Sequence, residues 1–160
     1  MARKGLVALL LVVLAASGCG EEGAAGGATV TVYVSAPLRG AEAEAGRRLC
    51  DEAREQADQG RGEEDLRLRV VCLDASEGDR AWSLAQVGAN ARRATEDSTA
   101  VAYVGEPDPE ARRQSRPIVD AAGIAQLGGM TGREAVAAVR AAIAEGDESE
   151  PRKAVFDAEG

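Results

Sequence analysis

The apolar positions of this chain switch repeatedly between the period of a strand and the period of a helix. Short runs rich in β-branched and other apolar residues predict strands at 28–34, 66–73, 99–104 and 124–127. Between the first three strands, apolar residues recur at helical spacing, which predicts helices over 41–59 and 84–94. Strands that alternate with helices are typical of an α/β fold with a parallel sheet.

The helical spacing also predicts which side chains face the core. In the first helix, which Gly60 should end, the inward stripe is expected to comprise Ala45, Leu49, Ala53 and Ala57, with Cys50 beside it. In the second helix the inward positions are expected to be Leu84, Val87, Ala91 and Ala94, with Asn90, Arg92 and Arg93 in solvent. The strand at 66–73 alternates leucine with arginine, which predicts an edge or near-edge position.

The third helical region is expected to consist of two pieces. The run Asp-Pro-Glu at 108–110 supplies a capping side chain, a proline suited to the first turn and an acid that complements the helix dipole. Pro117 lacks the backbone N–H that a helix interior needs, so we expect it to break the helix. Ser115 is then expected to cap a second piece over 116–122.

A fourth helix is predicted after the last strand. Thr131 and Glu134 have the spacing of a capping box, and apolar residues share one face up to Gly146. Residues 147–160 form a tail in which a short helix is expected. The order predicts one domain over 28–146, a doubly wound, mostly parallel four-stranded sheet with helices on both faces.

The N-terminus has the pattern of a secretory signal. Arg3 and Lys4 precede an uncharged apolar run at 6–16, and small residues follow up to Cys19. As a helix this run would rise about 17 Å, too short for a hydrocarbon core of about 30 Å. A buried core helix is the alternative, but its basic start and Gly-Cys-Gly end favour a signal peptide over 1–18.

The small residues before Cys19 resemble the lipobox of bacterial lipoproteins. The resemblance implies that the Cys19 thiol carries a diacylglyceryl group and becomes the new N-terminus. Two or three acyl chains hold a domain on a membrane durably. The expected location is therefore the outer face of the cytoplasmic membrane, with residues 19–27 as a flexible tether to the fold.

The chain has three cysteines, and lipidation of Cys19 would leave Cys50 and Cys72 as a pair. Export to an oxidising compartment favours a disulfide between them. Two free core thiols are the alternative.

Charge and composition exclude several functions. Removal of Arg3 and Lys4 with the signal leaves 17 basic residues against 27 acidic ones, interleaved along the chain, so a nucleic-acid partner is not expected. The absence of histidine excludes a Ser-His-Asp triad and any imidazole metal site. No dinucleotide fingerprint or P-loop occurs, and the acidic runs lack a calcium-loop pattern, so neither a cofactor nor a metal is predicted.

Two weaker signals lie in predicted loops. Glu106 and Asp108 could serve acid–base catalysis, but two solvated acids in a loop are the more ordinary interpretation, so we predict no enzyme. The glycine-rich run 128–132 before a helix could hold an anion, or could simply be a flexible connection.

Five stretches together resemble the N-terminal lobe of type I extracytoplasmic substrate-binding proteins of ABC transporters, the class that binds branched-chain amino acids. They are VTVYVSAPLRG, CLD, WSLAQVGANARRATED, VAYVGEPDPEA and SRPIVDAAGIAQL, within 28–127. The resemblance implies a disulfide between the first helix and the second strand, in agreement with the parity of the cysteines. Residues after 127 resemble the helices that follow the second lobe in this family. The resemblance therefore implies that the second lobe is missing.

The resemblance places ligand contacts in the loops after strands one, three and four. The candidate residues are Ser35, Pro37, Leu38, Gly105, Glu106, Asp108, Gly128 and Gly129. Members that bind amino acids offer hydroxyls and backbone N–H groups to the ligand carboxylate, whereas this chain has acids and prolines after strand three. Amino-acid specificity is therefore not carried over.

The leading hypothesis is a lipid-anchored solute-binding component reduced to one lobe. Its expected partners are membrane lipid through Cys19, an amino acid or other small polar ligand, and an ABC permease, a second lobe or a second protomer. The alternative is a non-catalytic surface lipoprotein that acts as a structural or protein-interaction module.

Overall fold

The computed structural model describes residues 28–59, 66–78 and 80–159. The predicted signal at 1–18, the lipidation site Cys19 and the tether at 19–27 lie outside the described residues. So do the expected helix stop at Gly60 and the acidic run at 63–65.

Strands and helices alternate through the whole described part. In chain order the elements are β1 (Thr29–Ala36), α1 (Ala43–Gln59), β2 (Arg67–Asp74), α2 (Leu84–Thr95), β3 (Ala100–Val104), α3 (Pro109–Asp120), β4 (Ala125–Leu127), α4 (Gly132–Glu145) and α5 (Pro151–Glu159). The strands form one four-stranded sheet in the order β2-β1-β3-β4, and every pairing is parallel. The α/β prediction is confirmed, with β2 at an edge and with no antiparallel strand in the sheet.

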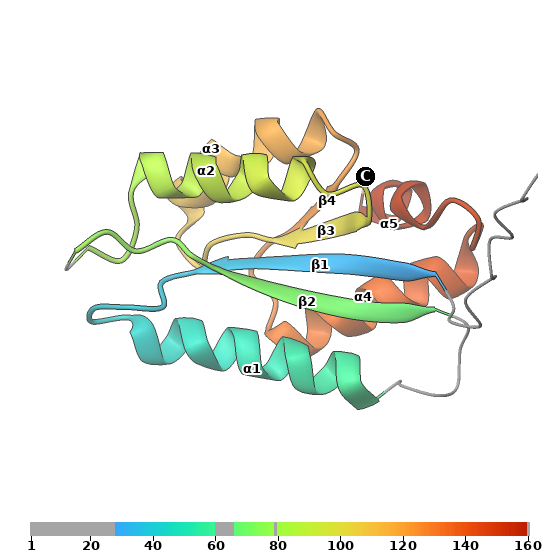
Figure 1. Ribbon diagram of the computed structural model, residues 1–160, viewed down its shortest axis with the longest axis horizontal. Helices are drawn as coiled ribbons and strands as arrows, with labels where there is room; N and C mark the ends of the chain where they lie inside the picture. Colours follow the sequence, from blue (N-terminus) through green and yellow to red (C-terminus); the bar gives the residue numbers. More distant parts are fainter. Residues whose placement is uncertain (1–27, 60–65, 79, 160) are drawn as a thin grey trace, which may run out of the picture.

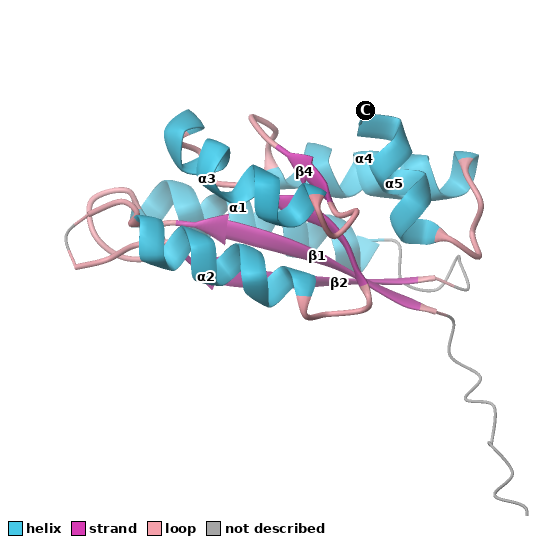
Figure 2. Ribbon diagram, turned by 90° about the horizontal axis from the view of Figure 1, so that it is seen from above, coloured by secondary structure: helices cyan, strands magenta, loops and turns pink. Residues whose placement is uncertain are grey.

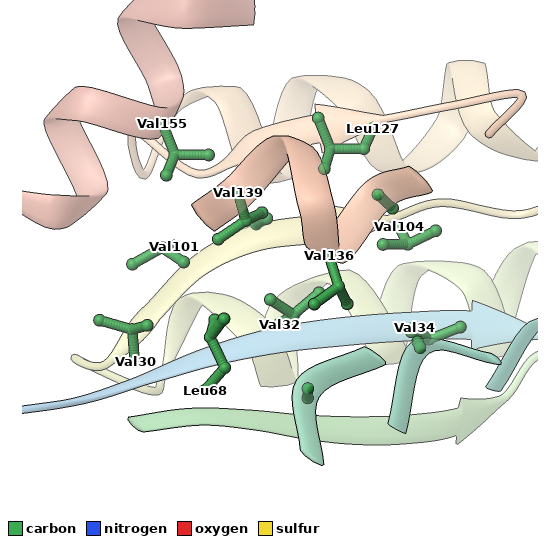
Figure 3. Close-up of a cluster of buried hydrophobic side chains, with 14 of the residues drawn as sticks. Val30, Val32, Val34, Leu68, Val101, Val104, Leu127, Val136, Val139 and Val155 are labelled. Atoms are coloured by element: carbon green, nitrogen blue, oxygen red, sulfur yellow. The ribbon is translucent and has the colours of Figure 1, made fainter. Parts of the chain in front are cut away.

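Helices cover both faces of the sheet (Figures 1 and 2). On one face α1, α4 and α5 pack against a core that includes Val32, Val34 and Val104 (Figure 3). On the other face α2 and α3 pack against Tyr33 and Tyr103. Alternate residues of β1 therefore belong to opposite cores, as the period of a strand requires.

Three assignments of helix faces were wrong, two inward-facing and one outward-facing. Ala45 is exposed, and the buried stripe of α1 runs instead through Ala43, Gly46, Cys50, Ala53 and Ala57. Leu84 opens α2 with 61% of its surface exposed. Asn90, expected in solvent, is buried because its amide donates to Ser35 Oγ at 2.9 Å and to the Asp74 carbonyl at 3.1 Å. Two hydrogen bonds remove the cost of burying that amide.

Pro117 does not break the third helix, which was also a wrong expectation. The helix α3 continues from Pro109 to Asp120 with Pro117 inside it. Pro117 is exposed, so the hydrogen bond that it removes lies on the solvent side, where water can satisfy the freed carbonyl. Ser115 is buried inside the helix and caps nothing.

The C-terminal helix packs on the sheet through an arginine and a core valine. In α5, Arg152 donates from Nε to the Ala100 carbonyl at 2.7 Å, and from Nη2 to the carbonyls of Asp97 and Ser98 at 3.0 and 2.8 Å. Val155 of the same helix is buried in the core under α4. The expected short helix in the tail is thus part of the domain.

Candidate functional site

The candidate ligand residues lie at the carboxyl ends of the strands. This side of the sheet is called the ligand edge below. Ser35 is the last but one residue of β1, and Pro37 and Leu38 follow that strand. Residues 105–108 follow β3, and residues 128–129 follow β4. These three strands are neighbours, and all arrows point toward the same side in Figure 1. The chain leaves β1 toward β2 on one side and reaches β3 on the other, which makes this edge the topological switch point of the sheet.

Glu106 is buried behind this edge, with 1% of its surface exposed. Its carboxylate accepts from the Tyr103 hydroxyl at 2.9 Å and from Ser115 Oγ at 3.0 Å. Gln126 Nε2 in turn donates to Ser115 Oγ at 2.6 Å. Burial, and after it the Glu106 carboxylate, raises the pKa of Tyr103, so the phenol stays protonated and donates. The buried hydroxyls of Tyr103 and Ser115 are therefore already bonded to Glu106.

Ser35 is also buried, in a second hydrogen-bonded group beside the first. Its hydroxyl accepts from the Asn90 amide, which also binds the carbonyl at the end of β2. These contacts join the ends of β1 and β2 to helix α2. The Ser35 side chain thus connects β1 to α2 and does not face solvent.

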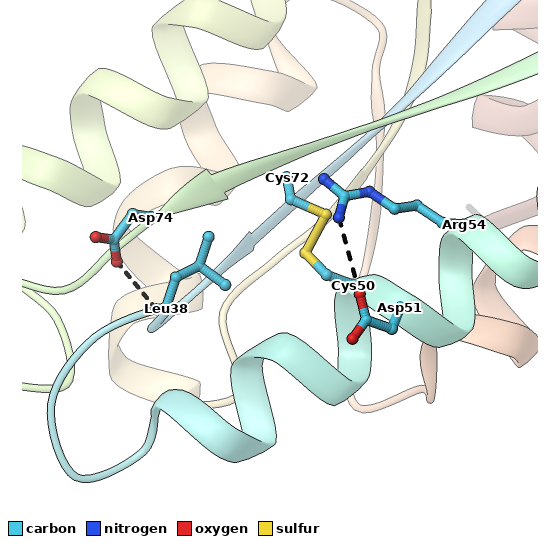
Figure 4. Close-up of a disulfide and its surroundings, with 6 residues drawn as sticks. All are labelled: Leu38, Cys50, Asp51, Arg54, Cys72 and Asp74. Carbon is cyan, nitrogen blue, oxygen red and sulfur yellow. Dashed lines mark hydrogen bonds and ion pairs between the residues drawn. A yellow bond between two sulfur atoms is a disulfide. The ribbon is translucent and has the colours of Figure 1, made fainter.

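Asp74 organises the loop that carries Pro37 and Leu38. Its Oδ1 accepts from the backbone N–H of Leu38 at 3.0 Å (Figure 4). The same oxygen accepts from the backbone N–H of Ser76 at 2.9 Å, and Arg39 pairs with Oδ2. Burial by itself would raise the pKa of Asp74, but the hydrogen bonds from Ser76, Leu38 and Arg39 outweigh it and lower the pKa to about 2. The loop therefore depends on an ionised carboxylate.

We expect Asp74→Asn to destabilise the fold by about 1–2 kcal/mol at pH 7, after allowance for solvent screening. Because the folded pKa is depressed, this stabilisation is present above the unfolded value of about 4 and is lost as pH falls toward about 2. Urea denaturation of the variant and the wild type at pH 7 and pH 2 measures the difference, which should shrink at the lower pH.

Asp51→Asn is the matched control, because the Asp51 side chain on α1 is 74% exposed. It should change stability by less than about 0.5 kcal/mol. A constant Asp74→Asn penalty at both pH values would contradict the role assigned to the ionised carboxylate.

Asp108 serves as the N-cap of α3, as its position in the sequence predicted. Its Oδ1 accepts from the backbone N–H groups of Glu110 at 2.7 Å and Ala111 at 3.1 Å. The bond from Ala111, with that from Glu110, holds the pKa of Asp108 below its usual range. Its carboxylate is thus committed to the helix end.

Arg112 is a second cationic group at this edge, beside Arg39, and no sequence pattern had singled it out. Its Nη1 donates to the carbonyls of Glu106 and Pro107, both at 2.9 Å. Its side chain lies over Gly128, where an added Cβ would come within 2.7 Å of Arg112 Cδ. The sequence held one indication of this position. Arg112 follows the predicted cap Asp108 by four residues, and that spacing places it on the side of the helix that faces the loop at 105–108.

Gly128 and Gly129 shape the connection from β4 to α4. Gly128 is exposed and leaves room for Arg112, and Gly129 adopts a φ of 77°, which favours glycine. Thr131 and Glu134 form the predicted capping box, and α4 starts at Gly132. Gly128 thus leaves room for the arginine beside the end of β4, and Gly129 permits the turn that follows.

Cys50 of α1 and Cys72 of β2 are joined by a disulfide, with their Cα atoms 6.0 Å apart (Figure 4). The bridge lies on the α1 face, away from Ser35, Glu106 and Arg112. It ties the edge strand to the helix that covers it.

A metal site and a membrane-spanning helix are two other features considered for the described part of the chain. There, no group of three or more acidic or cysteine side chains is placed to hold a metal ion. Among the helices described, none combines the length and the apolar character that crossing a membrane requires.

The architecture and its switch point are those of a single lobe of a periplasmic-binding fold. A structure described as a possible leucine/isoleucine/valine-binding protein from Rhodopirellula baltica matches with a TM-score of 0.54 and 18% identity, over 62% of this chain and 27% of its own. A candidate branched-chain amino acid ABC transporter protein from Rhodospirillum rubrum matches with a TM-score of 0.52 and 21% identity, over 64% of this chain and 28% of its own. A leucine-binding protein from Thermotoga maritima matches with a TM-score of 0.51 and 18% identity, over 62% of this chain and 27% of its own.

The match with these structures covers 27 to 28% of their length. At such identities the likeness establishes the fold and leaves the ligand open. No protein-family model matches the sequence, and no curated protein matches it either.

Proposed function

We propose that this chain is a lipid-anchored, extracytoplasmic solute-binding component, related to the amino-acid-binding proteins of ABC transporters and reduced to one lobe. It binds a small polar ligand and does not catalyse a reaction. The domain is held at the membrane through Cys19 and works with a permease.

The observation that carries this proposal is the position of Arg112 at the switch point. The guanidinium is fixed by the Glu106 and Pro107 carbonyls and lies across the ends of β3 and β4. Ligands of open parallel sheets bind at this edge, and a guanidinium is suited to a carboxylate. The acids of the same edge, Asp74, Glu106 and Asp108, already accept hydrogen bonds within the chain. The amino acid carboxylate is therefore assigned to Arg112.

Binding is expected to be weak, since a ligand on one lobe keeps much of its surface in water. We expect dissociation constants of about 1 mM, or roughly −4 kcal/mol, for at least one of leucine, isoleucine, valine or a polar amino acid. Two-dimensional NMR of the mature chain during titration measures such affinities, and the shifted signals should include Arg112.

The adjacent arginine provides the matched control. Arg112→Ala should weaken binding about tenfold, the value of one charge-assisted hydrogen bond, whereas the exposed Arg113→Ala should not change it. The thermal midpoint of each variant verifies that it is folded. Titrations without shifts for every amino acid, or equal effects of the two substitutions, would refute ligand capture at this edge.

A structural or protein-interaction module is the second candidate. It is favoured by the Glu106 carboxylate, which already accepts from the buried hydroxyls of Tyr103 and Ser115, so these hydroxyls are not free to hold a ligand. On this hypothesis the edge meets another protein or a second copy of this chain. Light scattering that detects a dimer, together with flat amino-acid titrations, would favour this function.

A further inference from the structure

The strand β2 has a partner strand on one side only. Its one neighbour in the sheet of the described chain is β1, and Figure 1 shows β2 at the border of the sheet, next to α1. The N–H of Arg67 donates to the Ala28 carbonyl at 2.8 Å, and the two strands stay in register up to Asp74. Because successive residues of a strand direct their backbone groups to opposite sides, the odd-numbered residues of β2 face β1. The N–H and C=O groups that point away from the sheet belong to Leu68, Val70 and Cys72, called here the β2 border.

The β2 border is open to a further strand. Among the described residues, no backbone group outside the sheet bonds to it, and such a row of donors and acceptors is a template for strand pairing. The side chains of the border are apolar and belong to the core under α1. The charges of the strand lie on its other face, where Arg69 is paired with Asp97 at 2.7 Å. They therefore leave the border accessible.

The helix α1 carries a row of alternating charges beside this border. On one flank of α1, Leu49 and Ala53 lie against α4 at Gly132. Helical spacing puts a row of exposed side chains on the opposite flank, namely Arg47, Asp51, Arg54 and Asp58. The disulfide holds this flank over β2, and Figure 4 shows Asp51 and Arg54 beside it.

This row of charges is complementary to its own reverse. When two α1 helices lie antiparallel with their rows facing, Asp51 of each copy is opposite Arg54 of the other, and Arg47 is opposite Asp58. Each position thus meets the opposite charge, which favours this partner and this register over others.

The strand by itself defines a similar antiparallel arrangement. When two β2 strands pair with Val70 opposite Val70, Leu68 of each copy lies opposite Cys72 of the other. Residues opposite one another in such positions exchange two hydrogen bonds, so every N–H of the β2 border finds a carbonyl.

The two arrangements have nearly the same centre. The Cα atoms of Cys50 and Cys72 are 6.0 Å apart. From Cys50, the middle of the charge row is about 4 Å further along α1, at about 1.5 Å per residue. Since α1 runs opposite to β2, that point is level with Val71, about one strand residue of about 3.3 Å from Val70. One two-fold axis can therefore satisfy the strand and the helix together.

We propose that β2 and the charged flank of α1 form a homodimer surface, on which two copies of this chain pair their β2 strands antiparallel about Val70. The two sheets then become one continuous sheet. Because the paired strands are antiparallel, the two ligand edges point in opposite directions and stay uncovered. The inference rests neither on the lipid anchor nor on solute binding.

Sedimentation of the mature chain measures the pairing, for which we expect a dissociation constant of about 0.1 mM, at the weak end for a small interface. Asp51→Arg should weaken it at least tenfold, because two cations then face each other across the axis. Arg54→Asp should do the same with two carboxylates. The double variant restores opposite charges and should pair within about twofold of the wild type.

Glu145→Arg is the matched control, since it makes the same change of charge at an exposed position of α4, on the other side of α1 from β2. It should leave the dissociation constant unchanged. All the substituted side chains are exposed, and the thermal midpoint of each variant verifies that it is folded.

Amide hydrogen exchange locates the contact. At about 1 mM only about a fifth of the chain is then monomeric, so the N–H groups of the β2 border should exchange about fourfold more slowly than at about 10 µM. The N–H of Arg69, which faces β1, should exchange at the same rate at both concentrations.

A chain that stays monomeric at about 1 mM would overturn the homodimer surface. A dimer that Asp51→Arg does not weaken, or a β2 border whose exchange ignores concentration, would overturn it as well. Each of these outcomes leaves solute binding intact, because Arg112 lies outside the paired surface.

Discussion

Replacing Gly132 with alanine is expected to destabilise the domain by about 3 kcal/mol. Gly132 opens α4 and lies directly on the backbone of α1, where an added Cβ would come within 2.0 Å of the Leu49 carbonyl oxygen and 2.6 Å of the Ala53 nitrogen. Both atoms belong to a helix backbone, which cannot rotate away as a side chain can. The two helices would have to separate, which opens the core around Ala53 and Val136.

Gly88→Ala in α2 is the matched control, a second glycine inside a helix. The nearest atom to its added Cβ is the tip of the flexible Arg92 side chain, at 3.3 Å. This substitution should stabilise the protein by up to about 1 kcal/mol, through helix propensity. Urea denaturation measures both variants, and a Gly132→Ala variant as stable as Gly88→Ala would refute the close packing of α1 and α4.

Loss of the disulfide between Cys50 and Cys72 is the second large effect expected. The cysteines are 22 residues apart, and in the chain-entropy model a loop of this size contributes about 3 kcal/mol by restricting the unfolded chain. We expect Cys50→Ala, Cys72→Ala and the double variant to lose stability by similar amounts, since each removes the same bridge. Denaturation of the chain without reductant gives the values.

Wild-type protein with reductant provides the control without any substitution. It should lose the same stability as the double variant, apart from the small packing loss at the alanine positions. Two thiols that react with an alkylating agent before reduction would contradict the bridge. Additive losses for the two single substitutions would contradict its role in stability.

The helix ends could be predicted from the sequence because their chemistry is local. Asp108 caps α3, and Thr131 with Glu134 caps α4, in both cases through backbone groups two or three residues away. The strands could be predicted equally well, because β-branched runs such as 28–34 have few other stable arrangements. Local rules failed at Pro117, where exposure to solvent makes the missing hydrogen bond tolerable.

The candidate site could be predicted from the sequence only in part. Its location followed from strand order and the family resemblance, since loops after neighbouring parallel strands meet at one edge. The helical spacing assigned Asn90 to solvent, and no sequence pattern gave a reason to bury Glu106 or to place Arg112 over Gly128. These placements depend on partners such as Ser35 and Ser115, which are distant in the chain or lie on another element.

The sequence by itself determined the alternation of strands and helices and the helix caps, because periodicity and capping arise from interactions within a few residues. The parallel α/β class follows from that alternation. Only the tertiary structure decided which face of α1 is buried, which acids are already hydrogen-bonded and which cation lies at the ligand edge. The physical reason is that helix docking selects these contacts. At Gly132 the close approach of α4 to α1 requires a residue without a side chain, and no local pattern around it indicates that requirement.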